Sequence, residues 1–239
     1  MDYLDHTWPT PAENLAVDEV LLDAAAAGQR GETLRFWAAP NPFVVLGHSN
    51  CLLREANATA CAKLGVPILR RCSGGGAVLQ GPGILSYALV LDLKRHSDLA
   101  AVSQANLYIM SKNARILSGF LGQETRLEGI TDLVIAGRKV SGNAQRRKRR
   151  FLLFHGTLLL TPDLKLMEQV LPMPSRSPGY RANRGHADFV GNISAEPEAL
   201  KTTWRLAWGA TPSGEKIDSA QLNQLVATKY NRDSWNRKF

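Results

Sequence analysis

Apolar residues recur at helical spacing over residues 12–27, where AENLAVDEVLLDAAAA follows Pro11 and ends before Gly28. Proline near the first turn and glycine just past the last turn are typical of helix ends, so this segment predicts the first helix. Further helices are predicted at 53–65, 99–119, 195–207 and 218–230, with one or two helical turns at 163–170.

Runs rich in β-branched and aromatic residues lie between turn signals and predict strands. Two of these runs, at 133–145 and 151–161, flank a short polar tip and predict an antiparallel hairpin. The segment 171–192 is rich in Pro, Arg, Gly and Ser and predicts a long loop, and loops of that length are often functional. The other predicted strands are 33–40, 43–49, 66–72 and 84–93, with strand character starting already at 77.

Strands and helices in this order predict an α+β fold, with a mixed, mostly antiparallel sheet flanked by helices. No polar linker divides the 239 residues, so we expect one domain over 1–239, with no accessory C-terminal domain evident. No apolar run approaches the roughly 20 residues that span a bilayer. The N-terminus lacks the pattern of a signal peptide, and three scattered cysteines do not indicate a disulfide framework. We therefore expect a cytoplasmic protein without a membrane partner.

The formal net charge of +8 favours an acidic partner, which leaves nucleic acid, an anionic cofactor and an acidic protein surface open. Part of the excess is local, because QRRKRR at 145–150 contains five consecutive basic residues. Such a run is usually a solvated hairpin tip. No helix-turn-helix extension and no basic stretch interleaved with aromatic residues is present, so nucleic acid is the less favoured partner.

The most unusual stretch is RRCSGGGAVLQGPG at 70–83, which contains three consecutive glycines. It does not end in Gly-Lys-Ser/Thr as a P-loop does, it does not open a helix as a dinucleotide fingerprint does, and it contains no G-x-S-x-G elbow. Ordered glycine is entropically costly, and three exceed the need of a turn. We infer a loop between strands whose amides meet a ligand, with Arg70 and Arg71 supplying positive charge.

A second feature is GRKVSGNAQ at 137–145, where Lys139 lies on a predicted strand between two glycines. A strand lysine usually points to solvent. In a ligand pocket, however, it would offer a compact charge to phosphate and carbonyl oxygens. The small residues Ser141, Gly142 and Ala144 would let a substrate come close. Spacing alone leaves both interpretations open.

The segments RRCSGGGAV, DLVIAGRKVSGNAQRR and HGTLLL, in this order and spacing, resemble the lipoate–protein ligase family. That family shares a superfamily with biotin ligases and octanoyltransferases, and the resemblance covers nearly all of the chain. It implies a catalytic domain of the biotin/lipoate protein ligase type. It also implies that lipoate or octanoate is activated by ATP, with Mg²⁺, to an acyl-adenylate. The acyl group then passes to a lysine of a lipoyl carrier domain, and the basic loop is suited to an acidic carrier.

Carried over by the same resemblance, Lys139 is the catalytic residue that contacts the acyl carbonyl and the phosphate. No metal ligand is assigned. His155 has a simpler alternative, as a half-buried strand histidine. The binding residues that the resemblance implies are Arg71, Ser73, Gly74, Gly75, Gly76 and Ala77 in the loop, Ser141, Gly142 and Ala144 after the lysine, and His155, Gly156 and Thr157 on the returning strand.

The sequence departs from the family pattern after the glycine loop, where Gln80 stands at a histidine-like position and the following acid is missing. Adenylation then requires a separate partner, or proceeds in this domain alone, or is absent. In the last case the protein would be an octanoyltransferase that carries the acyl group on a cysteine. Cys72, next to two arginines, is the candidate nucleophile, whereas Cys51 and Cys61 have the setting of structural residues. A nucleic-acid or regulatory binding module is the second alternative.

Overall fold

The computed structural model describes residues 1–212, 214 and 217–239. Within this part of the chain the largest element is an eight-stranded sheet in the order β11-β1-β2-β6-β10-β9-β8-β7. Its pairs are antiparallel, except that β1 runs parallel to both β2 and β11. The strands are β1 (Asp2–Asp5), β2 (Thr33–Trp37), β6 (Ile84–Asp92), β7 (Arg126–Glu128), β8 (Asp132–Ile135), β9 (Arg138–Lys148), β10 (Phe151–Leu159) and β11 (Thr211–Pro212).

A second, three-stranded sheet is formed by β3 (Phe43–Leu46), β4 (Ile68–Arg70) and β5 (Val78–Gln80), in the order β4-β3-β5. The glycine loop joins β4 to β5, which are the two outer strands of this sheet. The Gly81–Gly83 turn then carries the chain from β5 into β6 of the large sheet. The glycine loop is therefore positioned where the two sheets meet.

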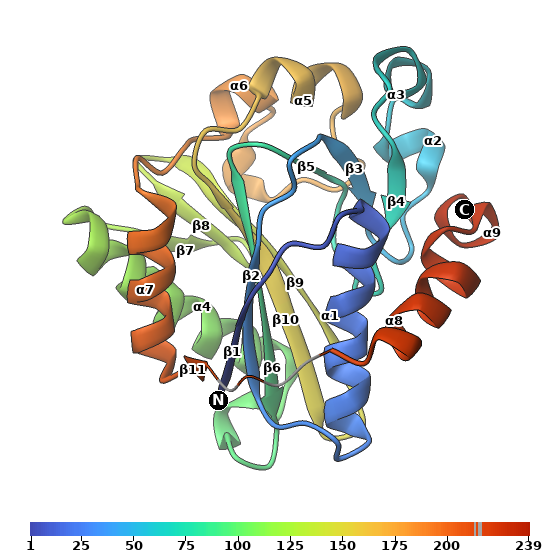
Figure 1. The fold of residues 1–239 in the computed structure, drawn as a ribbon. Helices are drawn as coiled ribbons and strands as arrows, with labels where there is room; N and C mark the ends of the chain where they lie inside the picture. Colours follow the sequence, from blue (N-terminus) through green and yellow to red (C-terminus); the bar gives the residue numbers. More distant parts are fainter. Residues whose placement is uncertain (213, 215–216) are drawn as a thin grey trace.

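Helices cover both faces of the large sheet (Figure 1). On one face lie α1 (Pro11–Ala26) and α8 (Ser219–Leu225), which continues as a π-helical segment at Val226–Tyr230. On the other face lie α4 (Val102–Leu121) and α7 (Pro197–Trp208). Because both faces are covered, all nine residues of β6 are buried. Along β6, Leu89 and Leu91 face α4 and α7, whereas Ala88 and Val90 face α1.

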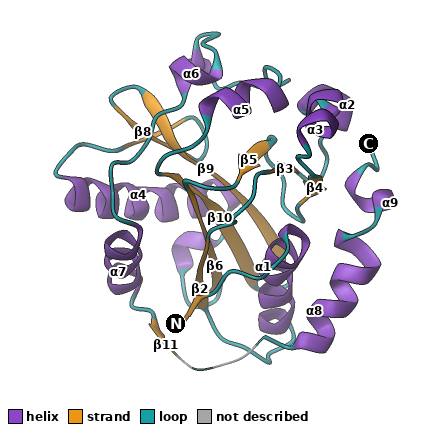
Figure 2. Ribbon diagram, turned by 45° about the horizontal axis from the view of Figure 1, so that its top comes forward, coloured by secondary structure: helices purple, strands orange, loops and turns teal. Residues whose placement is uncertain are grey.

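The short helices gather around the small sheet (Figure 2). They are α2 (Leu52–Glu55), α3 (Ala58–Leu64), α5 (Leu164–Val170), the 3-10 turn Gly179–Arg181, and α6 (His186–Phe189). A third apolar cluster lies beneath them and includes Val44, Leu46, Met167 and Phe189. The remaining elements are the 3-10 turn Ser97–Leu99 and the C-terminal α9 (Asp233–Asn236).

The predicted α+β class and the mostly antiparallel, mixed sheet are confirmed. The first helix begins where the sequence predicts, because Thr10 caps it and forms a capping box with Glu13. Among the described residues, no helix has the length and apolar character that crossing a membrane requires.

Three boundaries were wrong. The predicted helix 53–65 is two helices, because Asn57 caps α3 and interrupts the first. The predicted strand 133–145 is β8 and β9 joined by a tight turn, where Ala136 and Gly137 both have positive φ. The predicted loop 171–192 contains a 3-10 turn and α6.

Candidate active site

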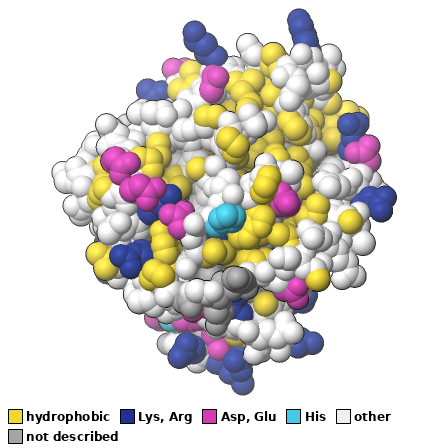
Figure 3. Space-filling model, viewed as in Figure 1, with side chains coloured by type: hydrophobic (Ala, Val, Ile, Leu, Met, Phe, Trp, Pro, Cys, Tyr) yellow, Lys and Arg dark blue, Asp and Glu magenta, His cyan; other side chains and the backbone are white. Residues whose placement is uncertain are grey.

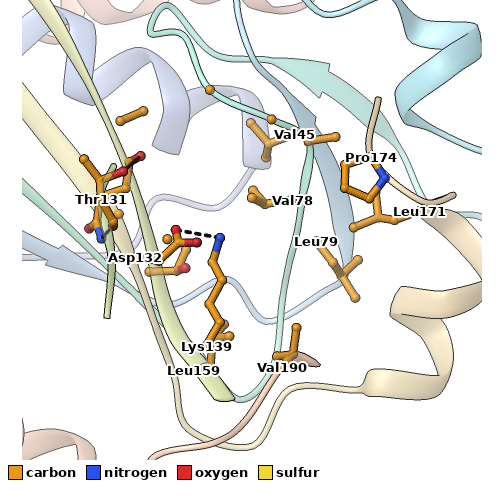
Figure 4. Close-up of a pocket in the computed structure, with 18 of the residues that line it drawn as sticks. Val45, Val78, Leu79, Thr131, Asp132, Lys139, Leu159, Leu171, Pro174 and Val190 are labelled. Atoms are coloured by element: carbon orange, nitrogen blue, oxygen red, sulfur yellow. Dashed lines mark hydrogen bonds and ion pairs between the residues drawn. The ribbon is translucent and has the colours of Figure 1, made fainter. Parts of the chain in front are cut away.

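A cavity of about 480 Å³ lies between the two sheets. Its walls come from α1, from β2, β3 and β5, from the glycine loop, from β9 and β10, and from the segment 171–190. The Lys139 side chain and the loop residues Gly75, Gly76 and Ala77 line the same space. Figure 4 shows Lys139 reaching from its strand into the space between Asp132 and Val78. The two sequence motifs therefore meet across one cavity, although more than sixty residues separate them.

The glycine loop is shaped from within by Arg71. The guanidinium donates to the carbonyl of Gly74 from Nε (3.0 Å) and Nη2 (2.6 Å), and Nη2 also donates to the carbonyl of Gly76 (2.9 Å). Burial lowers the pKa of Arg71 to about 10, so the group stays protonated at neutral pH. No hydrogen bond within the described part of the chain uses the amides of Gly74, Gly75 or Gly76. Arg71 thus binds the carbonyls of Gly74 and Gly76, and these three amides remain without a hydrogen-bond partner among the residues that the structure describes.

Gly75 and Gly76 lack a side chain for different reasons. Gly75 has φ of +87°, and a Cβ there would come within 2.7 Å of Arg71 Nη2, so this glycine is required by the loop itself. A Cβ on Gly76 would meet nothing within 4 Å. Since Gly76 lines the cavity, the space next to it is open to a ligand.

Ser73 is held by a chain of buried polar groups behind the loop. His155 Nδ1 donates to Asp18 Oδ2 (2.7 Å), and the Ser73 hydroxyl bonds His155 Nε2 (2.5 Å). The order serine, histidine, aspartate resembles a hydrolase triad. However, Ser73 is 1% exposed, accepts a bond from Arg71 Nε at 3.1 Å, and does not line the cavity. This series of hydrogen-bonded side chains therefore positions Arg71 and the loop, and it presents no accessible nucleophile.

Arg35 closes this chain on the far side. Its Nη1 lies 2.6 Å from Asp18 Oδ1, and Nη1 and Nη2 also donate to the backbone carbonyl and side chain of Asn14. The side chain is fully buried, and this burial lowers the pKa of Arg35. Asn14 and Asp18 lie one turn apart on α1, so a single helix face provides both acceptors. The fixed position of Asp18 depends on this arginine.

Lys139 has one acidic partner. Its Nζ lies 2.8 Å from Asp132 Oδ1, and the hydroxyl of Tyr180 donates to Asp132 Oδ2 at 2.8 Å. A Cβ on Gly142 would come within 2.8 Å of Lys139 Cε and 2.9 Å of Nζ. Gly142 therefore makes room for the lysine itself, which folds back over the strand toward the cavity.

Asn143 follows Gly142 and is held on every side. Its Oδ1 accepts a bond from the Tyr87 hydroxyl (2.6 Å), and its Nδ2 donates to the Thr131 carbonyl (2.7 Å) and to Ser141 Oγ (3.0 Å). A Cβ on Gly156 would lie 1.7 Å from Asn143 Oδ1. The predicted site residues Ser141 and Gly156 thus hold Asn143 in place. Ser141 is fully buried and does not line the cavity.

Some of the other predicted binding residues line the cavity, and others do not. Ala77, Ala144, His155 and Thr157 line the cavity, whereas Gly74 does not. Gln80, the departure from the family pattern, also lines it, and its Oε1 accepts a bond from Ser86.

Arg70 was wrongly predicted to supply charge to a ligand. It is fully buried and donates to five backbone carbonyls, those of Gly47, His48, Asn50, Trp235 and Asn236. It therefore fastens the C-terminal segment to the small sheet.

None of the three cysteines lines the cavity. Cys61 is buried in α3, and Cys51 precedes α2, in agreement with structural roles. Cys72 is also buried, and burial raises the pKa of its thiol to about 12. The adjacent arginines do not offset this, because Arg70 and Arg71 both point at backbone carbonyls. A Cys72 thiolate is therefore strongly disfavoured in the folded protein.

The basic run forms the predicted hairpin tip, but its side chains are largely engaged. Arg149 has φ of +53° and marks the turn between β9 and β10. At roughly 3.3 Å per strand residue, Lys148 lies about 30 Å along β9 from Lys139. The five residues bond the Cys72 carbonyl (Arg146), the Leu99 and Ala100 carbonyls (Arg147), Asp23 (Lys148), the Ala26 carbonyl (Arg149) and Asp92 (Arg150).

Several site residues were not predicted from the sequence. Asp18 and Trp37 lie in segments whose apolar pattern indicates core, and only folding brings them to the cavity. Asn143 lies within the lysine motif and Asp132 shortly before it, so the available signal for Asp132 was a carboxylate seven residues before Lys139. Arg181 lies in the segment that was predicted only as a functional loop.

The described residues contain no group of three or more His, Cys, Asp or Glu side chains that could hold a metal ion. Both carboxylate oxygens of Asp132 are already bonded, and Asp18 is occupied by Arg35 and His155. Mg²⁺ commonly binds proteins through one or two carboxylates together with substrate phosphates. The described residues therefore form no preassembled magnesium site, and a magnesium ion would have to be held mainly by the phosphates of a nucleotide.

Comparison with known proteins places these features in context. The profile described as "Lipoyl protein ligase A/B catalytic domain" matches residues 10–204. An octanoyltransferase LipM from Brevibacillus brevis is 26% identical, over 95% of both chains. A putative lipoate-protein ligase A from Aeropyrum pernix is 31% identical, over 93% of this chain and 75% of the relative. A crystal structure of lipoate-protein ligase A bound with ATP superposes with a TM-score of 0.82, at 21% identity and 99% coverage of each chain.

Proposed function

Because the chain belongs to the lipoyl protein ligase A/B family, we propose that it is an ATP-dependent lipoate/octanoate–protein ligase. In this proposal the acid and ATP form an acyl-adenylate with release of pyrophosphate, and the acyl group then passes to a lysine amine of a lipoyl carrier domain. The observation that carries the proposal is the single cavity, which combines the lysine ammonium and the unused loop amides with no cysteine in its walls.

The cavity lining combines two chemistries. Leu15, Trp37, Val45 and Ala144 offer apolar surface that suits an aliphatic tail. Lys139 and the cations of the segment 171–190 offer positive charge that suits a phosphate. On the face seen in Figure 1, Figure 3 shows hydrophobic side chains gathered in the upper part and Lys and Arg side chains mostly toward the edges. An acyl chain with a charged head would be held by both kinds of lining.

The proposed chemistry needs positioning and charge stabilisation. Attack on an activated carboxyl carbon builds negative charge on the carbonyl oxygen. A lysine ammonium fixed beside that oxygen stabilises the transition state more than the ground state. Asp132 and the Gly142 backbone fix Lys139 before substrate binds. ATP would supply the activation of the carboxylate, and the amides of the glycine loop are available to its oxygens or to those of the acid.

The carrier lysine must reach the cavity, so the carrier is expected to dock at its mouth. The mouth includes Arg176, which is exposed and has no hydrogen-bond or ion-pair partner among the described residues. With a net charge of +8, an acidic carrier would be steered toward this protein. The hairpin tip is the less suitable docking point, because its side chains are engaged and it lies far along β9.

A second candidate function is octanoyl transfer between carriers without ATP. It is favoured by the relatives named octanoyltransferase LipM, at 26% and 29% identity. An acyl-cysteine would require a cysteine at the cavity. The burial of Cys72 and its raised pKa weigh against this route.

One experiment separates the two functions. The protein is incubated with a lipoyl domain and octanoate, with or without ATP and magnesium, and the domain is weighed by mass spectrometry. We expect an octanoyl mass gain that depends on ATP and persists in Cys72→Ser. Gain only from an octanoyl-loaded carrier, abolished in Cys72→Ser, would establish the transferase.

In the folded protein we also expect Cys72 to resist alkylation at about pH 8.5, since its thiol stays protonated well above that pH.

Enlarging Gly76 tests whether the acyl group or nucleotide lies against the loop. Gly76→Val causes no collision by its Cβ within the protein, so any loss reports on the ligand. We expect ligation to fall by about 10- to 100-fold, because a displacement near 1 Å is costly to a reacting geometry. Gly119→Val is the matched control, since Gly119 lies exposed on α4, away from the cavity. Equal activity of the two variants would contradict contact between substrate and loop.

A further inference from the structure

Arg181 is a buried cation on the wall of the cavity. It ends the 3-10 turn Gly179–Arg181 and is 4% exposed. Its Nε donates to the Arg184 carbonyl at 2.9 Å, and its guanidinium stacks over Phe189 at 4.7 Å. Its Nη2 contacts Met173 Sδ at 3.4 Å and His186 Nδ1 at 3.5 Å, so Nη1 is the nitrogen left without a partner among the described residues. These contacts fix the side chain in one orientation.

No carboxylate accompanies this charge. Within residues 1–212, 214 and 217–239, no acid forms an ion pair with Arg181, and Nη1 has no hydrogen-bond partner. Burial lowers the pKa of Arg181, yet an arginine remains protonated in proteins. A buried charge without a partner is costly, so such a group is commonly kept for a ligand.

The other buried cations of the cavity are already committed. Lys139 is paired with Asp132, and Arg71 is bonded to the loop carbonyls and Ser73. Arg181 is therefore the buried cavity cation of the described chain that retains free donors. Its stacked, planar fork is suited to the oxygens of a phosphate or a carboxylate.

We propose that Arg181 binds a phosphate group of the nucleotide substrate through its free Nη1. This inference rests on the proposed function and assigns a specific residue to that site. Both a nucleotide phosphate and the carboxylate of the acid could approach a guanidinium. The phosphate is favoured because it offers more charge and more acceptor oxygens than a carboxylate, and because the residue before Arg181, Tyr180, bonds Asp132, the partner of Lys139.

Calorimetric titration of the full chain, without carrier, tests this assignment. The titrants are ATP, inorganic pyrophosphate and octanoate, each added alone to wild type, Arg181→Met, Arg181→Lys and Arg205→Met. Arg205→Met is the matched control, because Arg205 also stacks on an aromatic ring, that of Tyr3 at 5.7 Å, carries the same charge, and does not line the cavity. Circular dichroism in the near ultraviolet checks that each variant keeps its fold.

We expect Arg181→Met to raise the Kd of ATP and of pyrophosphate by about 10- to 100-fold, the range for a lost charge-assisted hydrogen bond. Arg181→Lys should recover part of this affinity, since it keeps the charge and loses the fork. The affinity for octanoate, and all affinities of the Arg205→Met variant, should stay close to wild type. If Arg181→Met does not fold, Arg181→Lys carries the test, and its Kd for ATP and pyrophosphate should be higher than that of wild type and of Arg205→Met.

Three results would overturn the assignment. They are an unchanged Kd for ATP and pyrophosphate in Arg181→Met and Arg181→Lys, an effect on octanoate alone, or a wild-type protein that binds neither phosphate compound. Failure of the ligase function itself looks different. In that case pyrophosphate still binds in an Arg181-dependent manner, but no ATP-dependent mass gain appears on the carrier.

Discussion

Lys139→Ala is expected to lower the rate of acyl transfer to the carrier by about 10²–10³-fold, the usual loss when one donor to a developing oxyanion is removed. The reason is local. Lys139 is fixed by Asp132 and extends into the cavity, so its ammonium can neutralise charge that appears only in the transition state. The measurement is the initial rate of octanoyl mass gain on a lipoyl domain at saturating substrates.

Lys148→Ala is the matched control for this substitution. It removes the same charge from the same strand, but Lys148 lies near the hairpin tip, pairs with Asp23 of α1, and does not line the cavity. We expect near-normal transfer from it. A folded Lys139→Ala protein with the activity of Lys148→Ala would show that the lysine does not take part in the reaction.

Arg35→Met is expected to produce the largest loss of stability, about 3–5 kcal/mol in the free energy of unfolding. The substitution leaves the buried carboxylate of Asp18 without its cation, in a position that is 3% exposed. For a chain of this size we expect the urea midpoint to fall by about 1–2 M. The measurement is equilibrium unfolding followed by far-ultraviolet circular dichroism.

The double variant Arg35→Met/Asp18→Asn isolates the cause. Because it also removes the unpaired charge, it should recover a substantial part of the lost stability. Arg126→Met, which removes an exposed arginine paired with Glu124, should change the midpoint little. If the double variant were as unstable as the sum of the two single variants, the buried ion pair would not be the source of the loss.

The fold class could be predicted from the sequence because β6 and β10 are long apolar runs and α1 carries clear end signals. The finer divisions could not. The Ala136–Gly137 turn divides an apolar run into β8 and β9 because both residues adopt positive φ. Alanine rarely has this conformation, so its presence in the sequence does not indicate a turn. Asn57 interrupts a predicted helix in a similar way, by capping the second of two short ones.

The glycine loop and Lys139 could be singled out from the sequence because three consecutive glycines and a lysine between two glycines are unusual, and the structure brings them to one cavity. The roles of the glycines were less predictable. Gly142 was expected to let a substrate come close, and Gly156 was a binding residue implied by the resemblance. In the structure, the absence of their side chains leaves room for Lys139 and for Asn143. Such a reason is visible only once the facing strand is in place.

Two of the groups that support the loop were not predicted from the sequence. Asp18 and Arg35 come from α1 and β2, and each lies in an apolar segment that indicates core, whereas His155 on β10 was singled out only by the resemblance. Their polar character inside apolar segments was the only local sign. Which of them would meet depended on the long-range pairing of β2 and β10 with β6.

The inward-facing guanidinium of Arg71 has a consequence for protein engineering. Grafting the nine residues RRCSGGGAV onto another scaffold would transfer the sequence of the loop but not the support that gives it its outline, meaning its backbone conformation. That outline also depends on a histidine, an aspartate and a second arginine, His155, Asp18 and Arg35, which come from distant parts of the chain and support Ser73 from behind. A functional graft would therefore have to include these buried residues together with the loop, and we expect natural variants of the loop and of these residues to change together.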